Sequence, residues 1–176
     1  MIPDILSDRP LSTEGMKYNN IISIEVTTDV ATEPVTLAEA KAHLRVDFTQ
    51  TDNDNDITRL RKVARLQVEN QINKGLGSRT IKVGVRNDKG NFKLPFGPVT
   101  SVTNVKDVDQ VTLETTAYSI KNGVLETKFT QPVFVTYVTG YATTPEDYKQ
   151  MILERLAYLY NNRGDIKKTN TGGWII

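Results

Sequence analysis

The sequence of 176 residues contains no cysteine and only one histidine and one tryptophan. The absence of cysteine excludes disulfides, zinc–thiolate sites and thiol catalysis, and it fits a reducing compartment. His43 lies within a predicted helix and has no second imidazole to share a ligand set or a catalytic pair. No phosphate-binding loop or dinucleotide fingerprint is present either. We therefore expect neither an enzyme nor a bound cofactor or metal.

Excess charge and long apolar runs are also lacking. The chain has 22 Lys and Arg against 21 Asp and Glu, whereas dedicated readers of duplex DNA usually carry a marked basic excess. The longest apolar-rich run, residues 133–141, is too short for a membrane helix. Residues 1–10 are acidic and contain two prolines, unlike a signal peptide. These features predict either a soluble intracellular protein or a part of an assembly built inside a cell, with no membrane partner.

Helical periodicity predicts two helices in the first half of the chain. Thr36 is a natural N-cap of the first, and Glu39 completes a capping box. The second runs from about residue 54 to residue 73, and Gly75 or Gly77 is expected to end it in the left-handed conformation. Its apolar stripe repeats at spacings of three and four: Ile57, Leu60, Ala64, Val68 and Ile72.

Alternating patterns predict an N-terminal strand and then a block of about six strands. In the first strand, Ile22, Ile24 and Val26 are expected to share the buried face. Later strands include residues 79–86 and 111–114. In the former, the buried side is expected to hold Ile81, Val83 and Val85.

The clearest local signal is a hairpin. Asn122-Gly123 fits the two central positions of a type I′ turn, which would pair Ile120 with Leu125. The run 133–141 that follows is apolar on both faces and is expected to be a central strand.

A third helix follows the β-block. Thr144 is expected to cap it, Pro145 to take the first helical position and Asp147 to close a capping box. Its apolar face consists of Met151, Ile152, Leu156, Leu159 and Tyr160.

Helices that flank a β-block must pack together if each is to bury its stripe. The predicted fold is therefore α+β: a small helical bundle with an inserted antiparallel β-sandwich or barrel and extended arms at both ends. The expected segments are an arm with a short strand, the first part of the bundle, the β domain, the last bundle helix and a C-terminal arm: residues 1–33, 34–77, 78–141, 142–164 and 165–176.

Three aspartates alternate just before the second helix, as the first ligands of a calcium loop do. An EF-hand loop that begins at Asp52 needs glycine at its sixth position and glutamate at its twelfth, where this chain has Ile57 and Val63. Acidic residues also complement the positive end of a helix, each by ~0.3–1 kcal/mol. We interpret Asp52, Asp54 and Asp56 as a helix start.

Two features predict contacts with other molecules. The second helix carries four cations, which form either a solvated flank or a contact with an acidic partner or a nucleic-acid backbone: Arg59, Arg61, Lys62 and Arg65. The final Trp174, Ile175 and Ile176 follow a polar stretch. They either fold back on the chain or dock in a groove of a neighbour.

Three segments, in this order, resemble the head–tail connector (adaptor, head-completion) proteins of long-tailed bacteriophages, related prophages and gene-transfer particles. The first is "EPVTLAEAKAHLRVD" with an acidic helix-opening stretch and "ARLQVEN"; the second is "KLPFGPVTSVTNVKDVD"; the third is "VFVTYVTGY" with "PEDYKQMILERLAYLYNNR". The likeness covers roughly residues 26–164. Tyr160, Asn162 and Arg163 match the family's ending of the last helix, but Gly164 replaces its acidic residue and Asp165 follows one place later.

The resemblance implies a non-enzymatic virion component without cofactors. Its relatives form a ring, generally a dodecamer, beneath the portal of the filled head. The ring extends the DNA channel and is a platform for the stopper or tail-completion protein. The implied partners are further copies, the portal protein and the stopper, with viral DNA passing through the lumen. The implied location is the virion neck, after assembly in the host cytoplasm.

The resemblance also gives the two sets of contact residues an expected role. The tail and the last helix would meet the portal or a neighbour: Trp174, Ile175, Ile176, Tyr160 and Arg163. The cations of the second helix would face the channel or a subunit interface: Arg59, Arg61, Lys62 and Arg65.

A different class of function competes with this interpretation. The sheet could be a receptor- or glycan-binding sandwich that the helices merely support. Such a module predicts aromatic residues on the sheet loops, whereas the single tryptophan, Trp174, lies in the tail.

Overall fold

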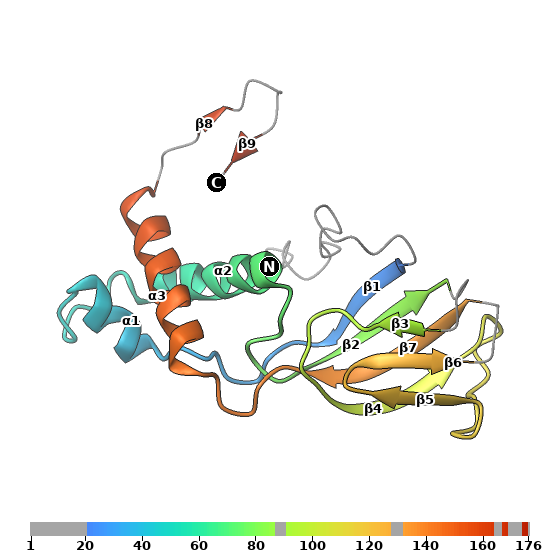
Figure 1. Cartoon of the computed structure of the whole chain (residues 1–176). Helices are drawn as coiled ribbons and strands as arrows, with labels where there is room; N and C mark the ends of the chain where they lie inside the picture. The colour runs from blue at the N-terminus through green and yellow to red at the C-terminus, as the bar shows by residue number, and fades with distance from the viewer. Residues whose placement is uncertain (1–20, 87–90, 128–131, 164–166, 169–173, 176) are drawn as a thin grey trace. The chain divides into compact units, whose positions relative to one another are not determined.

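The chain has an α+β fold with three helices and antiparallel sheets (Figure 1), which confirms the predicted class. The computed structural model describes most of the chain: residues 21–86, 91–127, 132–163, 167–168 and 174–175. Within these residues, no helix combines the length and apolar character needed to cross a membrane.

The chain divides into two compact units. The first, which we call the β unit, comprises Met1–Pro34 and Glu69–Pro145. The second, the helical unit, comprises Val35–Val68 and Glu146–Ile176. Residues 69–145 of the β unit thus lie between the two parts of the helical unit in sequence.

The β unit contains a four-stranded antiparallel sheet in the order β1-β2-β7-β4. Its strands are β1 (Ile21–Thr28), β2 (Arg79–Val85), β4 (Val99–Lys106) and β7 (Val133–Thr139). β7 lies between β2 and β4, so the prediction of a central strand is confirmed.

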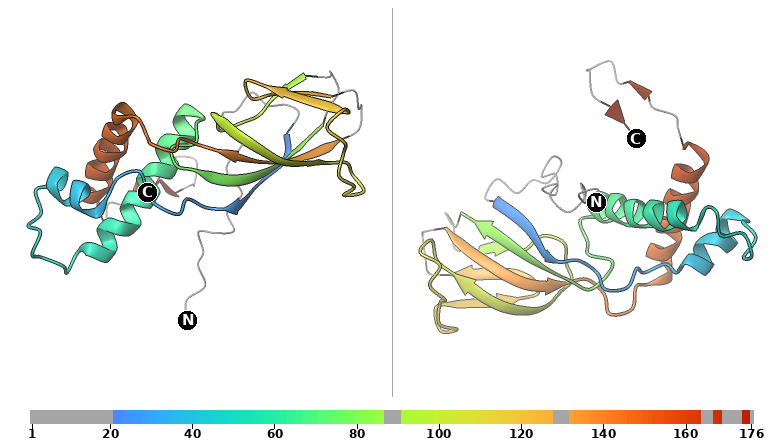
Figure 2. Two further views of the ribbon diagram at one scale, coloured as in Figure 1. Left: turned by 90° about the horizontal axis from the view of Figure 1, so that it is seen from below. Right: turned by 180° about the vertical axis from the view of Figure 1, so that it is seen from behind.

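A three-stranded antiparallel sheet, in the order β3-β6-β5, forms the second layer (Figures 1 and 2). Its strands are β3 (Asn91–Lys93), β5 (Tyr118–Lys121) and β6 (Val124–Thr127). Side chains of both sheets form one buried core: Ile81, Val83, Val85, Phe92, Leu94, Phe96, Val105, Leu125, Val133, Val135 and Tyr137. The predicted alternation of β2 is confirmed, because its three apolar residues belong to this core.

The β5–β6 hairpin also agrees with its prediction. Asn122 and Gly123 have φ angles of 52° and 74°, as a type I′ turn requires at both central positions. Ile120 lies opposite Leu125 in the register.

The prediction for β1 is wrong at two of its three residues, because Ile22 and Val26 are both exposed, Val26 at 36%. The register with β2 shifts between Ile21 and Ser23, so Ile21 lies opposite Val85 and packs against the core. Ile22, at the irregularity, is 47% exposed. A one-residue shift moves a side chain to the other face of a strand, and alternation alone does not reveal it.

The predicted strand at 111–114 is also wrong. Only Thr112 makes a β-bridge there, opposite Lys106. The segment instead follows a turn in which the Asp107 carboxylate accepts hydrogen bonds from the N–H groups of Asp109 and Val111, both at 2.9 Å.

The helical unit contains α1 (Leu37–Leu44), most of α2 (Asp54–Ile72) and α3 (Glu146–Asn161). α1 contacts α3, and the Arg155 Nε atom of α3 donates to Gln67 Oε1 of α2 at 2.5 Å. The apolar residues buried in this unit come from all three helices and the residue before α1: Val35, Ala40, Ile57, Leu60, Ala64, Val68, Ile152, Leu156 and Leu159. The helices that flank the β-block in sequence therefore contact each other, as predicted.

Two predicted helix ends differ in the structure. Past the end of α2, Asn73 has a φ of 52°, whereas neither Gly75 nor Gly77 has a positive φ, so the predicted glycine cap is wrong. Asparagine tolerates this conformation because its short polar side chain bonds locally. The start of α3 also differs: the helix begins at Glu146, whereas Pro145 was expected at its first position. The Thr144 hydroxyl, expected to cap the helix, donates to the Leu76 carbonyl oxygen at 2.5 Å.

The capping box of α1 is confirmed. The Thr36 hydroxyl accepts from the Glu39 N–H at 3.2 Å, and the Glu39 carboxylate accepts from the Thr36 N–H at 2.6 Å. The pKa of Glu39 is lowered, first by the hydrogen bond from the Thr36 backbone and then by that from its hydroxyl.

We expect Glu39→Gln to lower the free energy of unfolding by roughly 0.3–1 kcal/mol at neutral pH, because the anion complements the helix dipole. The folded pKa is depressed, so this contribution is complete above the unfolded value of 4.5 and disappears as the pH falls through the lower folded pKa. The wild-type advantage should therefore shrink in urea titrations between pH 7 and acid conditions. A constant difference would contradict this, and Glu154→Gln controls for loss of a surface carboxylate.

Candidate interaction surfaces

The aspartates ahead of α2 serve the helix and its neighbours. α2 begins at Asp54, with Asp54 and Asp56 in its first turn, so the interpretation as a helix start is confirmed. Asp54 pairs with the Lys41 ammonium at 2.6 Å, and Asp56 pairs with Arg59 at 2.7 Å. In the described part of the chain, no three His, Cys, Asp or Glu side chains gather to hold a metal ion.

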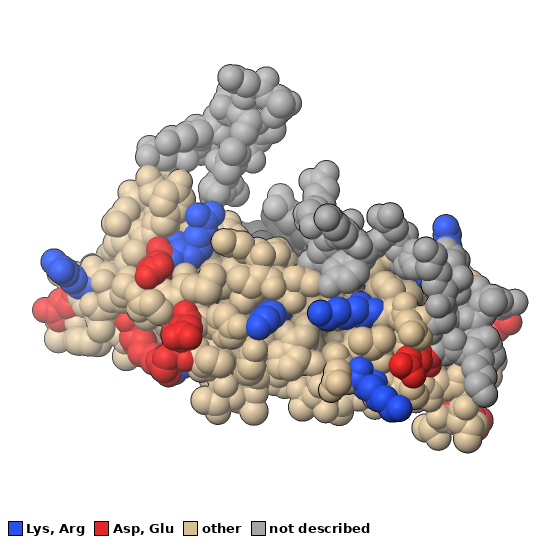
Figure 3. Space-filling model, in the orientation of Figure 1, with Lys and Arg blue, Asp and Glu red and all other residues tan. Residues whose placement is uncertain are grey.

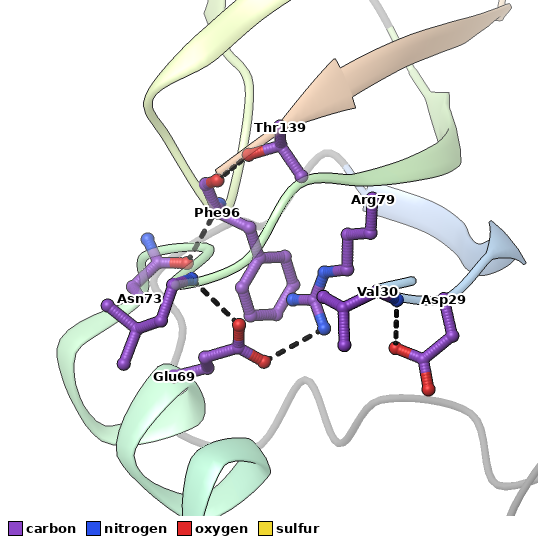
Figure 4. A network of polar contacts seen from close by, with 8 residues as sticks. Asp29, Val30, Glu69, Asn73, Arg79, Phe96 and Thr139 are labelled. Atoms are coloured by element: carbon purple, nitrogen blue, oxygen red, sulfur yellow. Dashed lines mark hydrogen bonds and ion pairs between the residues drawn. The ribbon is translucent and has the colours of Figure 1, made fainter. Parts of the chain in front are cut away.

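The most buried polar cluster lies in the β unit, at the C-terminal end of α2 (Figure 4). The side chains of Glu69 and Arg79 are both 0% exposed, and Arg79 Nη1 lies 2.9 Å from Glu69 Oε2. The other carboxylate oxygen accepts from the Leu76 N–H at 2.7 Å. The guanidinium carbon lies 5.0 Å from the centre of the Phe96 ring.

The surrounding backbone is held by the same cluster. Asn73 Oδ1 accepts from the Phe96 N–H at 3.3 Å, and the Thr139 hydroxyl donates to the Phe96 carbonyl oxygen. Gly75 N–H also donates to that carbonyl, at 3.1 Å. Because the charged pair is enclosed and its carboxylate accepts from the Leu76 backbone, this cluster positions the chain after α2.

The four cations of α2 do not form one exposed patch. Arg59 is exposed and paired with Asp56, whereas Arg61 Nη1 donates to the Val35 carbonyl at 2.9 Å. Lys62 is half-buried and Arg65 is fully buried. A contact with the channel or a neighbour therefore stays a prediction, and within one chain only Arg59 offers an exposed guanidinium for it.

On the face shown in Figure 3, Lys and Arg side chains are scattered, and the acidic side chains gather mainly over α1 and α3. This distribution agrees with the near balance of charges in the sequence. Such a surface attracts nucleic acid only weakly and in a salt-sensitive manner.

The structure brings together two of the predicted contact residues at the end of α3. The Arg163 guanidinium carbon lies 3.8 Å from the centre of the Tyr160 ring, and Nη1 lies 3.6 Å from Asp56 Oδ2. Asp56 thus contacts the cations of both α2 and the end of α3.

The other predicted contact residues lie in the C-terminal segment. β8 (Lys167–Lys168) and β9 (Trp174–Ile175) form an antiparallel pair, with Lys168 opposite Trp174. Ile176 lies outside the described residues. The docking of this segment on a neighbour stays a prediction.

Several large apolar side chains are exposed in the described residues: Ile22, Val26, Phe48, Val108, Val111 and Tyr158. Phe48 is the most exposed of these, at 62%, and sequence reasoning did not single it out. The sequence feature that could have indicated it is a lone aromatic residue in the polar loop between α1 and α2. An exposed aromatic side chain is a candidate anchor for an interface.

Each unit also has a surface hollow. That of the β unit, about 790 Å³, lies between the start of β4, the β5–β6 turn and the segment after α2. Its lining includes Lys74, Lys93 and Tyr141 but no carboxylate or imidazole among the described residues. That of the helical unit, about 460 Å³, lies between the start of α1 and the first turns of α3.

Comparisons with known proteins bear on what these surfaces contact. No protein-family model matches the sequence, and no curated protein matches it. A chain in a structure described as "Neck of empty GTA particle computed with C6 symmetry" has a TM-score of 0.71 and 19% identity, over 86% of this chain and 91% of that chain. A chain of "Virion of native gene transfer agent (GTA) particle" has a TM-score of 0.68 and 20% identity, over 83% and 88%. The protein therefore shares its fold with proteins of gene transfer agent particles.

Proposed function

We propose that this chain is a structural, non-enzymatic subunit of the neck of a phage-like particle, where it joins the head to the tail. The observation that carries the proposal is the match to a chain of a gene transfer agent neck over 86% of this chain. The three ordered segments that resemble head–tail connectors support it independently, because that resemblance lies in the sequence and does not depend on the fold.

The finer proposal is a ring beneath the portal that extends the DNA channel and carries the stopper or tail-completion protein. The related neck was computed with C6 symmetry, which a dodecameric ring of the related chain would satisfy. A closed ring needs contacts between unlike faces of neighbouring copies, and the two compact units offer such faces. The scattered cations suit a lumen through which DNA passes without tight binding.

Particles assembled without this protein test the proposal directly. We expect heads that package DNA, leak it and carry no tails when viewed by electron microscopy, and we expect the full chain supplied in trans to restore tails. Normal yields of tailed, DNA-retaining particles would overturn the proposal. Tailed particles that no longer attach to cells would instead favour the receptor- or glycan-binding alternative.

The same complementation can test the proposed portal contact of the C-terminal segment. A chain that lacks residues 166–176 should occupy portal-bearing heads less than the full chain does, if Trp174 and Ile175 dock there. Equal occupancy would disprove that role while leaving the neck function standing.

A further inference from the structure

The loop between β4 and β5 presents two apolar side chains on an ordered support. Val108 is 42% exposed and Val111 is 59% exposed. The Asp107 carboxylate accepts from the N–H groups of Asp109 and Val111, and the Asp107 N–H donates to the Val111 carbonyl oxygen at 3.0 Å. These bonds define one conformation of the loop tip. A preorganised loop loses little conformational entropy on binding, which favours its use as a contact.

The base of this loop is tied to the sheet. The Leu113 N–H donates to the Val105 carbonyl oxygen at 2.8 Å, and Thr112 forms a β-bridge with Lys106. Residues 107–114, which we call the β4–β5 loop, therefore form a compact projection from the end of β4.

The β4–β5 loop carries negative charge only. It contains Asp107, Asp109 and Glu114 but no Lys, Arg or His. Asp109 and Glu114 are exposed, and neither carboxylate pairs with a described residue. Even with Lys106, which directly precedes the loop, three carboxylates stand against one ammonium group. The loop thus combines exposed valines with a net negative charge.

The hollow of the β unit has the opposite charge. Its lining includes two ammonium groups, Lys74 and Lys93, and no carboxylate among the described residues. Lys93 is exposed and forms no ion pair with the described part of the chain. Water and salt screen the attraction between such exposed charges, so it contributes modestly to affinity. Complementary charges nevertheless orient two surfaces and disfavour wrong partners.

The same hollow offers apolar surface for the two valines. Its lining includes partly exposed aliphatic side chains: Ile72, Val99, Val102 and Ile120. Its volume of about 790 Å³ lies within the range of about 300–1,000 Å³ that is typical of ligand pockets. The hollow therefore has space for the tip of a loop, and burial of Val108 and Val111 there would stabilise the contact.

The β4–β5 loop and the hollow lie at opposite ends of β4 (Figure 1). The hollow includes residues 99–102 at the start of the strand, and the loop follows its last residue, Lys106. At a rise of about 3.3 Å per residue, the two ends of the strand are roughly 23 Å apart. The loop therefore does not reach the hollow of its own chain. Contacts between unlike surfaces of identical chains generate rings when the rotation closes.

We infer that the β4–β5 loop of one copy inserts into the hollow of the β unit of the next copy and forms a head-to-tail contact of the ring. Val108 and Val111 pack against the aliphatic lining, and Asp109 lies near Lys93. This inference rests on the proposed function, because it takes the ring as given. It assigns the loop of a second copy to the hollow because that loop carries both the apolar and the acidic groups that the lining complements.

Cysteine cross-linking tests the contact without background, because the natural chain has no cysteine. Chains with Val111→Cys are mixed with chains with Ser101→Cys, an exposed position in the lining, assembled into rings or particles, and treated with a short bismaleimide. We expect a cross-linked heterodimer from the mixture, and a ladder up to the full ring from the double variant. Phe48→Cys replaces Val111→Cys as the control. Because Phe48 is 62% exposed, a weaker signal from it cannot come from lower accessibility.

A second measurement reverses the charges. Asp109→Lys and Lys93→Glu should each raise the concentration needed for assembly into rings or particles by about 5-fold, because each replaces an attraction with a repulsion. The double variant should return toward the wild type, since its charges are again opposite. Glu25→Lys makes the same change at an exposed carboxylate of β1 and should have no such effect. Circular dichroism checks that the variants fold.

The outcomes separate this inference from the function on which it rests. Rings or particles that form while the cross-link between positions 101 and 111 stays at the control level would overturn the inference and leave the neck function intact. Normal rings of Asp109→Lys that fail to join heads would also overturn it, since the loop would then contact another protein. If the chain forms no ring and enters no particle, the proposed function fails and the inference fails with it.

Discussion

Replacing Glu69 with alanine is expected to lower the free energy of unfolding by about 3–5 kcal/mol, which is typical when one partner of a buried ion pair is removed. The side chains of Glu69 and Arg79 are both 0% exposed. Without the carboxylate, the guanidinium stays in a site that water does not reach, and the Leu76 N–H loses its acceptor. Urea unfolding of the wild type and the variant measures this loss of unfolding free energy.

Two further variants separate charge from hydrogen bonding. Glu69→Gln keeps an oxygen that can accept from the Leu76 N–H, so it should be less destabilising than Glu69→Ala. Asn70→Ala changes the exposed neighbouring residue and should stay within about 0.5 kcal/mol of the wild type. A loss below about 1 kcal/mol for Glu69→Ala would show that the pair contributes little and that Arg79 is accommodated without it.

The double variant Glu69→Ala with Arg79→Met adds a check on the physical reason. If the damage of the single variant comes from a buried guanidinium that has lost its Glu69 carboxylate, removing the guanidinium as well should restore part of the stability. Buried ion pairs are often replaceable by apolar side chains with little loss. Losses that simply add would indicate that the two residues act separately.

The sequence predicted the elements whose signals are local. The capping box of Thr36 and Glu39 and the type I′ turn at Asn122-Gly123 both lie within a few residues, so their chemistry is readable directly. The prediction of α2 rests on several apolar residues at spacings of three and four, so it does not depend on any single residue. The contact of α1 with α3 followed from a further argument: helices separated by a β-block can bury their apolar faces against each other.

The features that escaped prediction depend on register or on residues far apart. The exposure of Ile22 follows from a shift in the pairing of β1 with β2, and no single strand encodes its partner's register. Glu69 lies in the last part of α2 and Arg79 lies in β2. In the sequence, each therefore resembles an ordinary surface charge, because nothing local indicates that the two side chains pair. The left-handed residue after α2 is Asn73, whereas the general preference for glycine at this position favoured Gly75 or Gly77.

The candidate surfaces were only partly predictable for the same reason. Four cations in one helix were visible, but the sequence did not show that Arg65 is buried or that Arg61 bonds the Val35 carbonyl. Phe48 was visible as a lone aromatic residue in a polar loop. The hydrogen bonds by which Lys41, seven residues earlier, holds that loop depend on the tertiary structure and could not be predicted.

The second large effect is expected at Gly140, which follows β7. Gly140→Ala should lower the free energy of unfolding by about 2–5 kcal/mol. Its φ of 103° is unfavourable for residues with a side chain, which contributes about 1–2 kcal/mol. The added Cβ would also collide with the carbonyl oxygen of Gly77 and lie 2.6 Å from its carbonyl carbon, and such overpacking contributes about 1–3 kcal/mol.

The backbone at Gly140 has little freedom to relieve that collision. The Gly140 N–H donates to the Pro98 carbonyl at 3.0 Å, and its own carbonyl accepts from the Thr100 hydroxyl at 3.2 Å. The obstructing atoms belong to the main chain of Gly77, so no side-chain rotation removes them. Relief requires one of these segments to move and a hydrogen bond to lengthen.

Gly123→Ala is the matched control, because it isolates the conformational penalty. Gly123 also has a positive φ, 74°, but a Cβ there would meet only the Val99 Cγ2 atom, at an ordinary 3.5 Å. We expect it to lose about 1–2 kcal/mol. The excess loss of Gly140→Ala over Gly123→Ala, measured by urea unfolding of both variants, therefore reports the collision with Gly77 together with any extra strain from the larger φ of Gly140. Equal losses would mean that the 77 and 140 segments can separate without penalty, and that their close approach is not needed for the stability of the β unit.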